Sequence, residues 1–495
     1  MKLQELLRSV QDNTEIIGQF DVEINGISDD SRNVKPGDLF VAVKGNGFDG
    51  HQFIQSAVEK GAVAILCESV NESISIPQII VENTQSQLLP IALRFFGNPE
   101  KSLKLVGVTG TNGKTTVSTL IHDLLSGLGY KAGLIGTVSK RIGSEELESK
   151  LTTPGALELA HDLSKMVDAG CSHVIMEVSS HALKQNRVKG LDFAVALFTN
   201  LTRDHLDYHK TVEDYASSKQ LFFNSLSSES VAIVNADDEY FETMVSKTQA
   251  TVWEVSLQKG SGAVVLKNDA EGLRIDLDGM HLNSPLSGIF NAYNIIQAYL
   301  ACIALGANQH GLALTLETCK GAAGRLEKIK LNVSSSYPFV FIDYAHTPDA
   351  LENVSKTLKG IQKEDQELII VFGCGGNRDS GKRPIMAGIA EKYATKVIIT
   401  SDNPRFESPE IILDDIEKGF SETAKFQRIT DRKQAIEFVI SESNVDDLIL
   451  IAGKGHETYQ EVEGIRYPMD DKLIATHAML QKYAKQAVFT GKESF

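Results

Sequence analysis

The chain has 495 residues, of which 42% are hydrophobic, and its formal net charge is −16 at pH 7. This length is too great for one hydrophobic core and predicts about three domains of ~150 residues each. The negative charge excludes a general electrostatic attraction to nucleic acid or to an anionic membrane, so an anionic ligand needs a local site.

The N-terminal residues Leu3, Leu6, Leu7 and Val10 have the spacing of a short helix and not the unbroken apolar core of a signal peptide. No stretch approaches ~18 uninterrupted apolar residues. We therefore expect a cytoplasmic protein without a membrane-inserted segment. The cysteines form no C-x-x-C pair and are expected to be reduced, mostly buried thiols without a metal: Cys67, Cys171, Cys302, Cys319 and Cys374.

Three blocks of alternating strands and helices follow in chain order. The first block has strands at 38–45 and 62–68 around a helix at 51–61, and Gly97 and Pro99 mark its end. The second block has strands at 103–108, 173–178, 193–200 and 231–238, a possible hairpin within 263–282 and a helix at about 290–305. After Gly321 and Gly324, apolar runs predict strands at 339–346, 367–376, 396–405 and 447–455.

A glycine-rich loop lies in KLVGVTGTNGKTT, residues 104–116. The general phosphate-loop pattern requires an earlier glycine, but Gly110 and Gly113 still let consecutive backbone N–H groups turn inward. Lys114 stands where a lysine meets the β and γ phosphates, and Thr115 stands where a hydroxyl binds Mg²⁺. An amphipathic helix is expected to follow. The alternative is an ordinary strand-to-helix turn.

These elements predict an α/β protein of three domains. We expect a small N-terminal α/β domain at 1–100, a central ATPase domain of phosphate-loop type with a mostly parallel sheet at 101–326, and a C-terminal Rossmann-like α/β domain at 327–495. Ligands of open parallel sheets bind at the carboxyl ends of the strands, where polar loops occur in all three blocks. A multidomain enzyme with its site between domains is therefore expected.

The glycine loop belongs to a series of motifs that spans nearly the whole chain. In chain order they are DSR with PGDLFVA and DG, then GTNGKTT, TTP, MEVSSH, TNLTRDHLDYH, FNAYN, GRLE, DYAHTPDAL, FGCGGNRD, KRPIM, DNPR and GKGHE. The series resembles the Mur ligase and folylpolyglutamate synthetase superfamily, ATP-dependent enzymes that join an amino acid to a carboxylate. The order of the motifs narrows the resemblance to the MurE muramyl tripeptide synthetases.

The resemblance implies a ligase that adds meso-2,6-diaminopimelate to UDP-N-acetylmuramoyl-L-alanyl-D-glutamate in peptidoglycan precursor synthesis. ATP would phosphorylate the precursor carboxylate, and the incoming amine would displace phosphate from the acyl phosphate. Both steps concentrate negative charge on phosphoryl oxygens, so cations and Mg²⁺ are required. The ATP-binding residues implied are Gly110, Thr111, Asn112, Gly113, Lys114, Thr115, Thr116, Asn291, Asn294, Arg325 and Asp343.

The resemblance also implies a catalytic set around the loop lysine. Its members are Glu177 on Mg²⁺, His205 on a second metal, and Lys219 as a carbamate formed with CO₂; with Thr115 they would be the metal ligands. From residue types alone, Glu177 is a capping or salt-bridged carboxylate, His205 a loop histidine and Lys219 a solvated helix lysine. Asp207 and His209 are expected to have no such role.

Two further sets complete the implied site. The UDP-sugar-dipeptide residues are Ser31, Thr152, Thr153, Ser179, Gln185 and Arg187. The amino-acid residues are Arg378, Asp402, Asn403, Pro404, Arg405, Gly453 and Glu457. Asp-Ser-Arg is also a common turn sequence, Arg187 could be a surface arginine, and Asp343 and His346 could equally close a turn.

Arg405 is the residue expected to choose the amino acid. A guanidinium binds a carboxylate through two parallel hydrogen bonds, and diaminopimelate has a distal carboxylate that L-lysine lacks. Glu457 is suited to the distal ammonium. The alternative for Arg405 is a salt bridge with Glu407 or Asp402. Alternative functions are a lysine-adding muramyl ligase, a folylpolyglutamate synthetase or a non-catalytic carrier of UDP-muramyl peptides. We expect a monomer with small-molecule substrates only.

Overall fold

The computed structural model describes residues 1–10, 14–19, 21–45, 47–205, 208–333 and 336–484. The chain forms two compact units, residues 1–261 with 296–312 and residues 262–295 with 313–495. The predicted division into three domains, with limits at residues 100 and 326, is a different division of the chain and stays a prediction. Asp207 lies outside the described residues.

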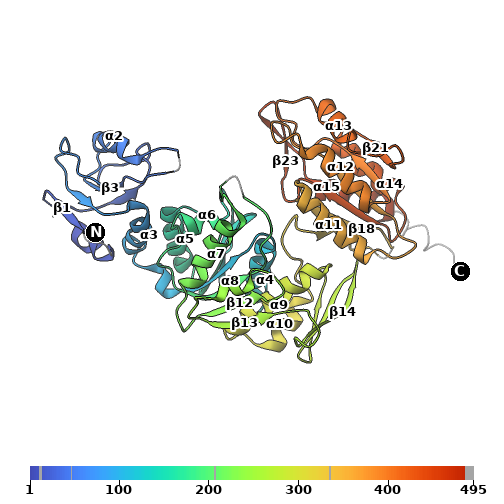
Figure 1. Ribbon diagram of the computed structural model, residues 1–495, viewed down its shortest axis with the longest axis horizontal. Helices are drawn as coiled ribbons and strands as arrows, with labels where there is room; N and C mark the ends of the chain where they lie inside the picture. The colour runs from blue at the N-terminus through green and yellow to red at the C-terminus, as the bar shows by residue number, and fades with distance from the viewer. Residues whose placement is uncertain (11–13, 20, 46, 206–207, 334–335, 485–495) are drawn as a thin grey trace. The chain divides into compact units, whose positions relative to one another are not determined.

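The first unit begins with a five-stranded sheet of order β1-β5-β4-β3-β2, drawn in blue in Figure 1. Strands β2 to β5 pair in parallel, and β1 joins β5 antiparallel. The strands are β1 (Glu15–Ile17), β2 (Gly26–Ser28), β3 (Asp38–Val41), β4 (Ala64–Cys67) and β5 (Gln78–Ile80). The helices are α1 (Leu3–Leu6), η1 (Leu7–Ser9), η2 (Gly50–Phe53), α2 (Ile54–Glu59), α3 (Thr84–Phe95) and η3 (Pro99–Ser102). The predicted strand–helix–strand order is confirmed as β3, α2 and β4, and α3 is an addition to the predicted elements.

The larger sheet of this unit has the order β13-β12-β11-β6-β10-β7-β8-β9. Pairing is parallel from β13 to β7 and antiparallel for β8 and β9. The strands are β6 (Lys104–Thr109), β7 (Ala132–Ile135), β8 (Ser139–Ile142), β9 (Glu145–Glu148), β10 (His173–Glu177), β11 (Phe193–Phe198), β12 (Val231–Asn235) and β13 (Thr251–Val255). The helices are α4 (Lys114–Gly127), α5 (Ala156–Asp168), α6 (Ser180–Lys184), α7 (Val212–Asn224) and α8 (Phe241–Val245), with α9 (Ile289–Ala304) and α10 (Gln309–Leu316) shared between the units. The predicted, mostly parallel sheet is confirmed.

Helix α4 begins where the sequence predicts a helix, and it is more buried than an amphipathic helix at the surface would be. Its residues are buried without a break from Thr115 to His122, and only Ser126 and Gly127 at its end are exposed. The helix packs against β6, β7 and β10 on one side, and the Cys302 thiol of α9 contacts it on another. A helix covered on several sides has no solvent face to keep polar.

The second unit contains a six-stranded sheet of order β17-β18-β22-β19-β20-β21 (Figure 1). All neighbours are parallel except the edge strand β17. The strands are β17 (Glu327–Lys328), β18 (Phe339–Asp343), β19 (Leu368–Phe372), β20 (Lys396–Ile399), β21 (Phe426–Arg428) and β22 (Leu448–Ala452). The helices are α11 (Pro348–Ile361), α12 (Lys382–Tyr393), α13 (Pro409–Glu417), α14 (Arg432–Glu442), α15 (Asp471–Met479) and η4 (Leu480–Ala484). All four strands predicted for this block are confirmed.

Alternate residues of β19 belong to two separate cores. Leu368, Ile370 and Phe372 pack with residues of α11, α12 and α13, whereas Ile369 and Val371 pack with residues of α14 and α15. Successive side chains of a strand point to opposite faces, so a strand covered on both faces must be apolar throughout. This explains the continuous apolar runs of the third block and agrees with the Rossmann-like prediction.

The hairpin predicted within 263–282 is present between the strands at 263–269 and 272–277, and a third antiparallel strand at 280–284 extends it to a three-stranded sheet. Its strands are β14 (Ala263–Asp269), β15 (Gly272–Leu277) and β16 (Met280–Ser284). The sequence MHLNS of β16 lacks β-branched and aromatic residues, so it gives little sign of a strand. Another hairpin consists of β23 (Tyr459–Val462) and β24 (Ile465–Pro468).

All five cysteines are buried and unbridged, as expected. Burial raises the pKa of the Cys67 thiol to about 11 and that of Cys374 to about 12, so both thiols stay protonated at neutral pH. Among the described residues, no helix is long and apolar enough to cross a membrane.

Candidate active site

The strand order of the eight-stranded sheet places three polar loops together in the first unit. Strand β6 lies between β10 and β11, and the three run parallel. They end at Thr109, Glu177 and Phe198, so the loops that follow meet at one edge of the sheet. The glycine loop, the MEVSSH motif and the TNLTRDH motif therefore converge.

The glycine loop has a fixed shape. Gly110 has φ +148°, and a Cβ there would lie 1.9 Å from the Thr199 hydroxyl oxygen, so no side chain fits. Asn200 holds the next turn, because its carbonyl oxygen accepts the Thr111 N–H at 2.8 Å and its side-chain oxygen accepts the Asn112 N–H at 2.9 Å. The neighbouring strand end therefore defines the loop.

Helix α4 starts at the end of this loop. Gly113 precedes it with φ +87°, and the buried Thr116 lies in its first turn. The Lys114 ammonium bends back and donates to the carbonyl oxygens of Gly110 and Thr111, both at 2.8 Å. A lysine beside the N–H groups of a helix N-terminus is the arrangement that binds phosphates.

Glu177 is fully buried and tightly held. Its Oε2 accepts the Thr115 hydroxyl at 3.1 Å and the Thr137 hydroxyl at 2.9 Å, and its Oε1 accepts the Thr137 N–H at 2.8 Å. A Cβ at Gly136 would lie 2.6 Å from Oε1, so this glycine leaves room for the carboxylate. Thr137 lies between β7 and β8 and begins no helix, so its bond does not make Glu177 a helix cap, and the salt-bridge alternative finds no partner among the described residues.

Lys219 of α7 is buried, so the alternative of a solvated lysine is wrong. Its ammonium nitrogen donates to the Gly110 carbonyl at 2.9 Å, lies 3.5 Å from the Thr109 hydroxyl and lies 4.5 Å from the centroid of the Tyr215 ring. Burial, with the nearby Lys114 ammonium, holds the pKa of Lys219 well below its usual value. In the part of the chain that the structure describes, no carboxylate forms an ion pair with it.

His205 lies in the loop after β11 and is about half exposed, with φ +54°. Its Nε2 is 3.5 Å from an Asp204 carboxylate oxygen, and its ring is 6.0 Å from the Tyr215 ring. The Tyr215 hydroxyl is 3.2 Å from Thr111 Oγ1, so this tyrosine borders His205, Lys219 and the glycine loop. No hydrogen bond joins His205 to Glu177 within the described ranges, and its role as a metal ligand stays a prediction.

The oxygen atoms around Glu177 suit a magnesium ion. Mg²⁺ is usually held by one or two carboxylates together with substrate phosphates, and Thr115, Thr137 and Glu177 supply hydroxyl and carboxylate oxygens. Among residues whose placement is described, no three His, Cys, Asp or Glu side chains gather into a metal-binding group. His209 is fully buried and 2.9 Å from the Ser180 hydroxyl, which agrees with a structural role.

Three of the residues predicted for the sugar-dipeptide surround the end of β10. The Thr153 hydroxyl donates to the Glu177 carbonyl at 2.8 Å and accepts the Ser179 N–H at 3.0 Å. The Thr152 hydroxyl is 3.0 Å from that of Thr137, which contacts the Glu177 carboxylate. The TTP and MEVSSH motifs are therefore one hydrogen-bonded cluster.

Arg187 joins the same cluster. It is partly buried, and it donates to the Thr153 carbonyl at 3.0 Å and to the Gln185 side-chain oxygen at 2.9 Å, so it is not a free surface arginine. Burial lowers its pKa, although it stays charged. Ser31 is buried between β2 and β3, and no hydrogen bond of the described residues connects its side chain to this cluster.

In the second unit, the six-stranded sheet brings four motif loops together. Strands β18, β22, β19 and β20 are neighbours and parallel, and they end at Asp343, Ala452, Phe372 and Ile399. The DYAHTP, GKGHE, GCGGNR and SDNPR motifs follow these ends directly. Their loops therefore lie along one edge of the sheet.

Asp343 closes a turn, as one alternative proposed. Its carboxylate accepts the Leu326 N–H at 2.6 Å and the Ala345 N–H at 2.8 Å, and burial raises its pKa. The Arg325 guanidinium lies 5.2 Å from the Tyr344 ring centroid, and its buried Nε has no hydrogen-bond partner among the described residues. Arg325 therefore retains a donor for a ligand.

The two predicted amides of α9 are buried and bonded to each other. The Asn294 side chain donates to the Asn291 side-chain oxygen at 3.0 Å, and Asn291 donates to the Ser287 carbonyl at 2.8 Å. Contact with the adenine or ribose of ATP stays a prediction for both. His346 is exposed, and its Nδ1 lies 2.9 Å from the Tyr344 carbonyl oxygen.

Asn403 and Glu457 meet between the SDNPR and GKGHE loops. The Asn403 amide donates to Glu457 Oε2 at 2.9 Å, and the fully buried Lys454 donates to Asn403 at 3.1 Å and to Glu457 at 2.9 Å. Asp402 forms no ion pair with Arg405 in the described chain, and its Oδ2 is buried without a hydrogen-bond partner. A Cβ at Gly453 would lie 2.5 Å from that oxygen, so glycine is required there.

Arg405 lies beside these residues with φ +53°, a conformation unusual for a residue with a side chain. Its guanidinium donates to the Gly376 carbonyl at 2.9 Å, and its Nε is 3.5 Å from a Glu461 carboxylate oxygen. The alternative of a salt bridge with Glu407 is wrong, because Glu407 pairs with Arg383 at 2.8 Å. The partner within the protein is Glu461.

Arg378 and Pro404 complete the predicted amino-acid set. Arg378 is exposed in the loop after β19, and Pro404 is buried. A Cβ at Gly376 would lie 2.0 Å from the Pro404 carbonyl oxygen, so the two loops touch at a glycine.

Sequence reasoning missed several residues that shape the site. Thr137 and Tyr215 contact Glu177 and Lys219 but stand outside the quoted motifs, whereas Lys454 lies within GKGHE and could have been singled out. Arg432 and Asp471 form a fully buried pair, with bonds of 2.6 and 2.8 Å, across 39 residues of sequence. No local pattern reveals such a pair.

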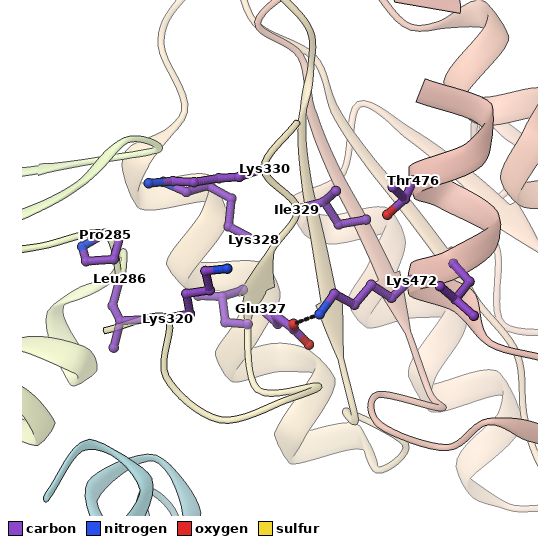
Figure 2. A pocket seen from close by; sticks show the side chains of 11 residues that line it. Pro285, Leu286, Lys320, Glu327, Lys328, Ile329, Lys330, Lys472 and Thr476 are labelled. Atoms are coloured by element: carbon purple, nitrogen blue, oxygen red, sulfur yellow. Dashed lines mark hydrogen bonds and ion pairs between the residues drawn. The ribbon is translucent and has the colours of Figure 1, made fainter. Parts of the chain in front are cut away.

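A separate cavity of about 270 Å³ lies in the second unit (Figure 2). Its charged lining residues are Lys320, Lys328, Lys330, Lys472 and Glu327. Glu327 pairs with Lys472 at 2.5 Å, and the Lys328 ammonium donates to the carbonyls of Ala270 and Glu271 at 2.8 and 2.7 Å. Burial, with Lys330 nearby, lowers the pKa of Lys328 to about 8. No residue predicted for the site lines this cavity.

Comparison with known proteins finds three family models along the chain. They are described as "Mur ligase family, catalytic domain" at residues 23–92, "Mur ligase middle domain" at 108–302 and "Mur ligase, glutamate ligase domain" at 324–455. Two relatives are named UDP-N-acetylmuramoyl-L-alanyl-D-glutamate--2,6-diaminopimelate ligase. The one from Cytophaga hutchinsonii is 43% identical, and the one from Phocaeicola vulgatus is 44% identical; each alignment covers 96% of this chain and 98% of the relative.

A solved structure of a protein with the same ligase name resembles the fold. Its TM-score is 0.73 at 33% sequence identity, and the match covers 97% of this chain and 99% of that chain. The similarity therefore extends through both compact units.

Proposed function

Because the chain belongs to the Mur ligase family, an ATP-dependent ligase family of peptidoglycan synthesis, we propose that it adds meso-2,6-diaminopimelate to UDP-N-acetylmuramoyl-L-alanyl-D-glutamate. The observation that carries the ligase chemistry is the convergence of Lys114, Glu177 and Lys219 on one glycine loop. Relatives with that ligase name, similar over nearly the whole chain, support the substrate pair.

The first step would be phosphorylation of the precursor carboxylate. The loop amides and Lys114 would bind the triphosphate, and Thr115 and Glu177 would hold Mg²⁺ beside it. When bound, Mg²⁺ would neutralise charge on the phosphoryl oxygens. A carboxylate oxygen attacks the γ-phosphorus of ATP and the bond to the β–γ bridging oxygen breaks, which gives an acyl phosphate and ADP.

The second step would form the amide bond. The free amine of diaminopimelate attacks the acyl carbon, phosphate leaves with the C–O bond electrons, and the amine loses a proton. Arg187, Thr152 and Thr153 would hold the precursor near Glu177. Thr153 is bonded to Glu177 directly, Thr152 is connected to it through Thr137, and Arg187 is connected to it through Thr153. Arg405 and Glu457 would bind the distal carboxylate and ammonium of the amino acid.

Carbamylation of Lys219 belongs to the same proposal. An unprotonated amine is the form that reacts with CO₂, and the burial of Lys219 beside Lys114 disfavours its protonated form. A carbamate would replace repulsion from Lys114 by attraction and would offer oxygen atoms to a metal. His205 would be the ligand of the second metal. The support for this role is its position beside Tyr215, which also lies next to Lys219.

Our proposal also includes the domain limits, the cellular location and the oligomeric state. We propose three domains at 1–100, 101–326 and 327–495, which bind the UDP-sugar, ATP and the amino acid in turn; the three family matches fall within or close to these limits. The protein would act in the cytoplasm as a monomer on small-molecule substrates.

One assay tests the proposed function. ADP release and tripeptide product are measured with ATP, Mg²⁺ and the UDP-muramyl dipeptide, with diaminopimelate or L-lysine added in parallel. The proposal requires turnover that depends on the dipeptide and on diaminopimelate. Turnover with lysine alone would instead identify a lysine-adding ligase, and no product with either amino acid would refute ligation.

A further inference from the structure

Lys454 is a lysine that the mechanism above does not use. It lies directly after Gly453 in the loop that follows β22, and its side chain is fully buried. A lysine is almost never fully buried unless it is paired. Its ammonium donates to Glu457 Oε2 at 2.9 Å and to Asn403 Oδ1 at 3.1 Å, and it lies 5.4 Å from the Tyr459 ring centroid. The site therefore contains a built-in cation between two residues of the amino-acid pocket.

The bonds of Lys454 determine which way the Asn403 amide faces. An ammonium can only donate, so the Asn403 side-chain oxygen must face Lys454 and its NH₂ must face Glu457. The same oxygen accepts the Glu461 N–H at 2.9 Å. A reversed amide would place donors against both Lys454 and Glu461. Lys454 and the Glu461 N–H thus together fix the amide in one orientation.

This network reaches the second specificity residue. Glu461, whose N–H is bonded to Asn403, accepts the Arg405 N–H through its carbonyl at 3.0 Å, and its carboxylate is 3.5 Å from the Arg405 guanidinium. Glu457 at one end and Arg405 at the other are therefore connected through Asn403. Among the described residues, the side-chain hydrogen bonds of Glu457 use Oε2, and its side chain remains 18% exposed, which leaves Oε1 for a ligand.

We propose that Lys454 is a positioning residue that sets amino-acid specificity by holding Asn403, and with it Glu457 and Arg405, in the geometry that accepts a distal ammonium beside a distal carboxylate. This inference rests on the proposed function. Lys454 would not touch the substrate, because its ammonium is already directed at two protein oxygens. Its removal would leave Glu457 without its protein cation and Asn403 with only the Glu461 N–H and the Glu457 carboxylate to orient it.

The test is a substitution series assayed with each substrate varied in turn. Lys454→Met keeps the length and removes the charge, and Lys454→Gln keeps a donor. For Lys454→Met, the KM for diaminopimelate is expected to rise at least about tenfold, ~1.4 kcal/mol. The KM values for ATP and for the UDP-muramyl dipeptide should stay within about twofold. Lys454→Gln should give a smaller rise.

Matched controls separate positioning from general damage. Lys392→Met removes an exposed lysine paired with Glu352 in the same sheet domain and should change no KM. In a Glu457→Gln background, Lys454→Met should add less than about threefold to the diaminopimelate KM, because the two residues act as one unit. Thermal unfolding and circular dichroism of Lys454→Met, compared with wild type, report whether the variant is folded.

Each outcome decides the inference. An unchanged diaminopimelate KM in folded Lys454→Met overturns it, and an equal rise for all three substrates assigns Lys454 a purely structural role and also overturns it. If Lys454→Met does not fold, Lys454→Gln must show the selective rise, or the inference fails. Wild-type protein that lacks turnover with diaminopimelate refutes the proposed function instead, so the two failures are distinct.

Discussion

Two buried lysines, one in each unit, are held in opposite ways. Lys454 in the second unit lies against the Glu457 carboxylate at 2.9 Å. Lys219 in the first unit lies against a carbonyl, a hydroxyl and an aromatic ring, with a second lysine nearby. The difference shows that burial alone does not define the state of a lysine. At Lys219, which has no carboxylate partner among the described residues, burial favours the free amine, which can react.

Removal of the reactive lysine should have the largest effect. Lys219→Ala should lower kcat about a thousandfold, because a group at the phosphoryl centre is lost. Short carboxylic acids that replace the carbamate oxygens should restore part of the activity. Steady-state ADP release measures both effects, and Lys247→Ala at an exposed lysine is the control. Full activity of the wild type in CO₂-free buffer would contradict the role of the carbamate.

Arg405→Ala should have the next largest effect. It should raise the diaminopimelate KM by roughly thirty-fold, since truncation of one partner of a charge pair costs about 2 kcal/mol when the pair is only partly buried, as the 22% exposed Arg405 side chain is. The KM for ATP and for the UDP-sugar should change little. If the diaminopimelate KM does not change, Arg405 does not choose the amino acid.

The contrast between the surroundings of Lys454 and those of Lys219 can be tested by the same Lys-to-Met substitution at both positions. Lys454→Met strands Glu457 without its partner and should lower the free energy of unfolding by about 3 kcal/mol. Lys219→Met in CO₂-depleted buffer removes an amine without a carboxylate partner and should be neutral or stabilising by about 1 kcal/mol. Urea unfolding of both variants measures the contrast. Equal destabilisation would mean that the two lysines are held alike.

Lys328 gives an intermediate case with the smallest expected effect. Its ammonium is partly buried against two carbonyl oxygens, and its pKa is lowered to about 8. At Lys328 the unfolded chain therefore binds more protons than the folded one between pH 8 and ~10.4, so the contribution of this residue to stability should rise with pH in this window. Partial exposure limits this contribution to about 1 kcal/mol. The difference in unfolding free energy between wild type and Lys328→Met, measured at pH 7.5 and 10, should shift in favour of wild type at the higher pH.

Local patterns predicted most of the fold and much of the candidate site. The strands that precede each motif were predictable because strands covered on both faces are apolar throughout, as β19 and β22 are. Strand β16 and the burial of α4 were not, since they depend on packing by distant residues. Gly110 and Lys114 follow from the phosphate-loop pattern, and Arg405 follows from the family resemblance.

The remaining site residues depend on distance in space. Thr137 reaches Glu177 across 40 residues, and Glu461, not Glu407, faces Arg405 because a bridge between Arg405 and Val462 brings β23 beside the SDNPR loop. The sequence of one segment alone does not show which distant residue it will contact in the folded chain. The state of Lys219 was likewise hidden, because sequence does not report that Gly110 and Tyr215 enclose it.

The residue before Arg325 sets a limit on how this protein can vary. A Cβ at Gly324 would lie 2.3 Å from the His456 backbone nitrogen, and one at Gly455 would lie 2.7 Å from the Tyr344 Cβ. The two chain segments thus cross at a point where neither Gly324 nor Gly455 has room for a Cβ atom. An engineer who varies this part of the chain could exchange Arg325 itself, but neither glycine at the crossing offers a usable starting point, and random libraries should return both unchanged.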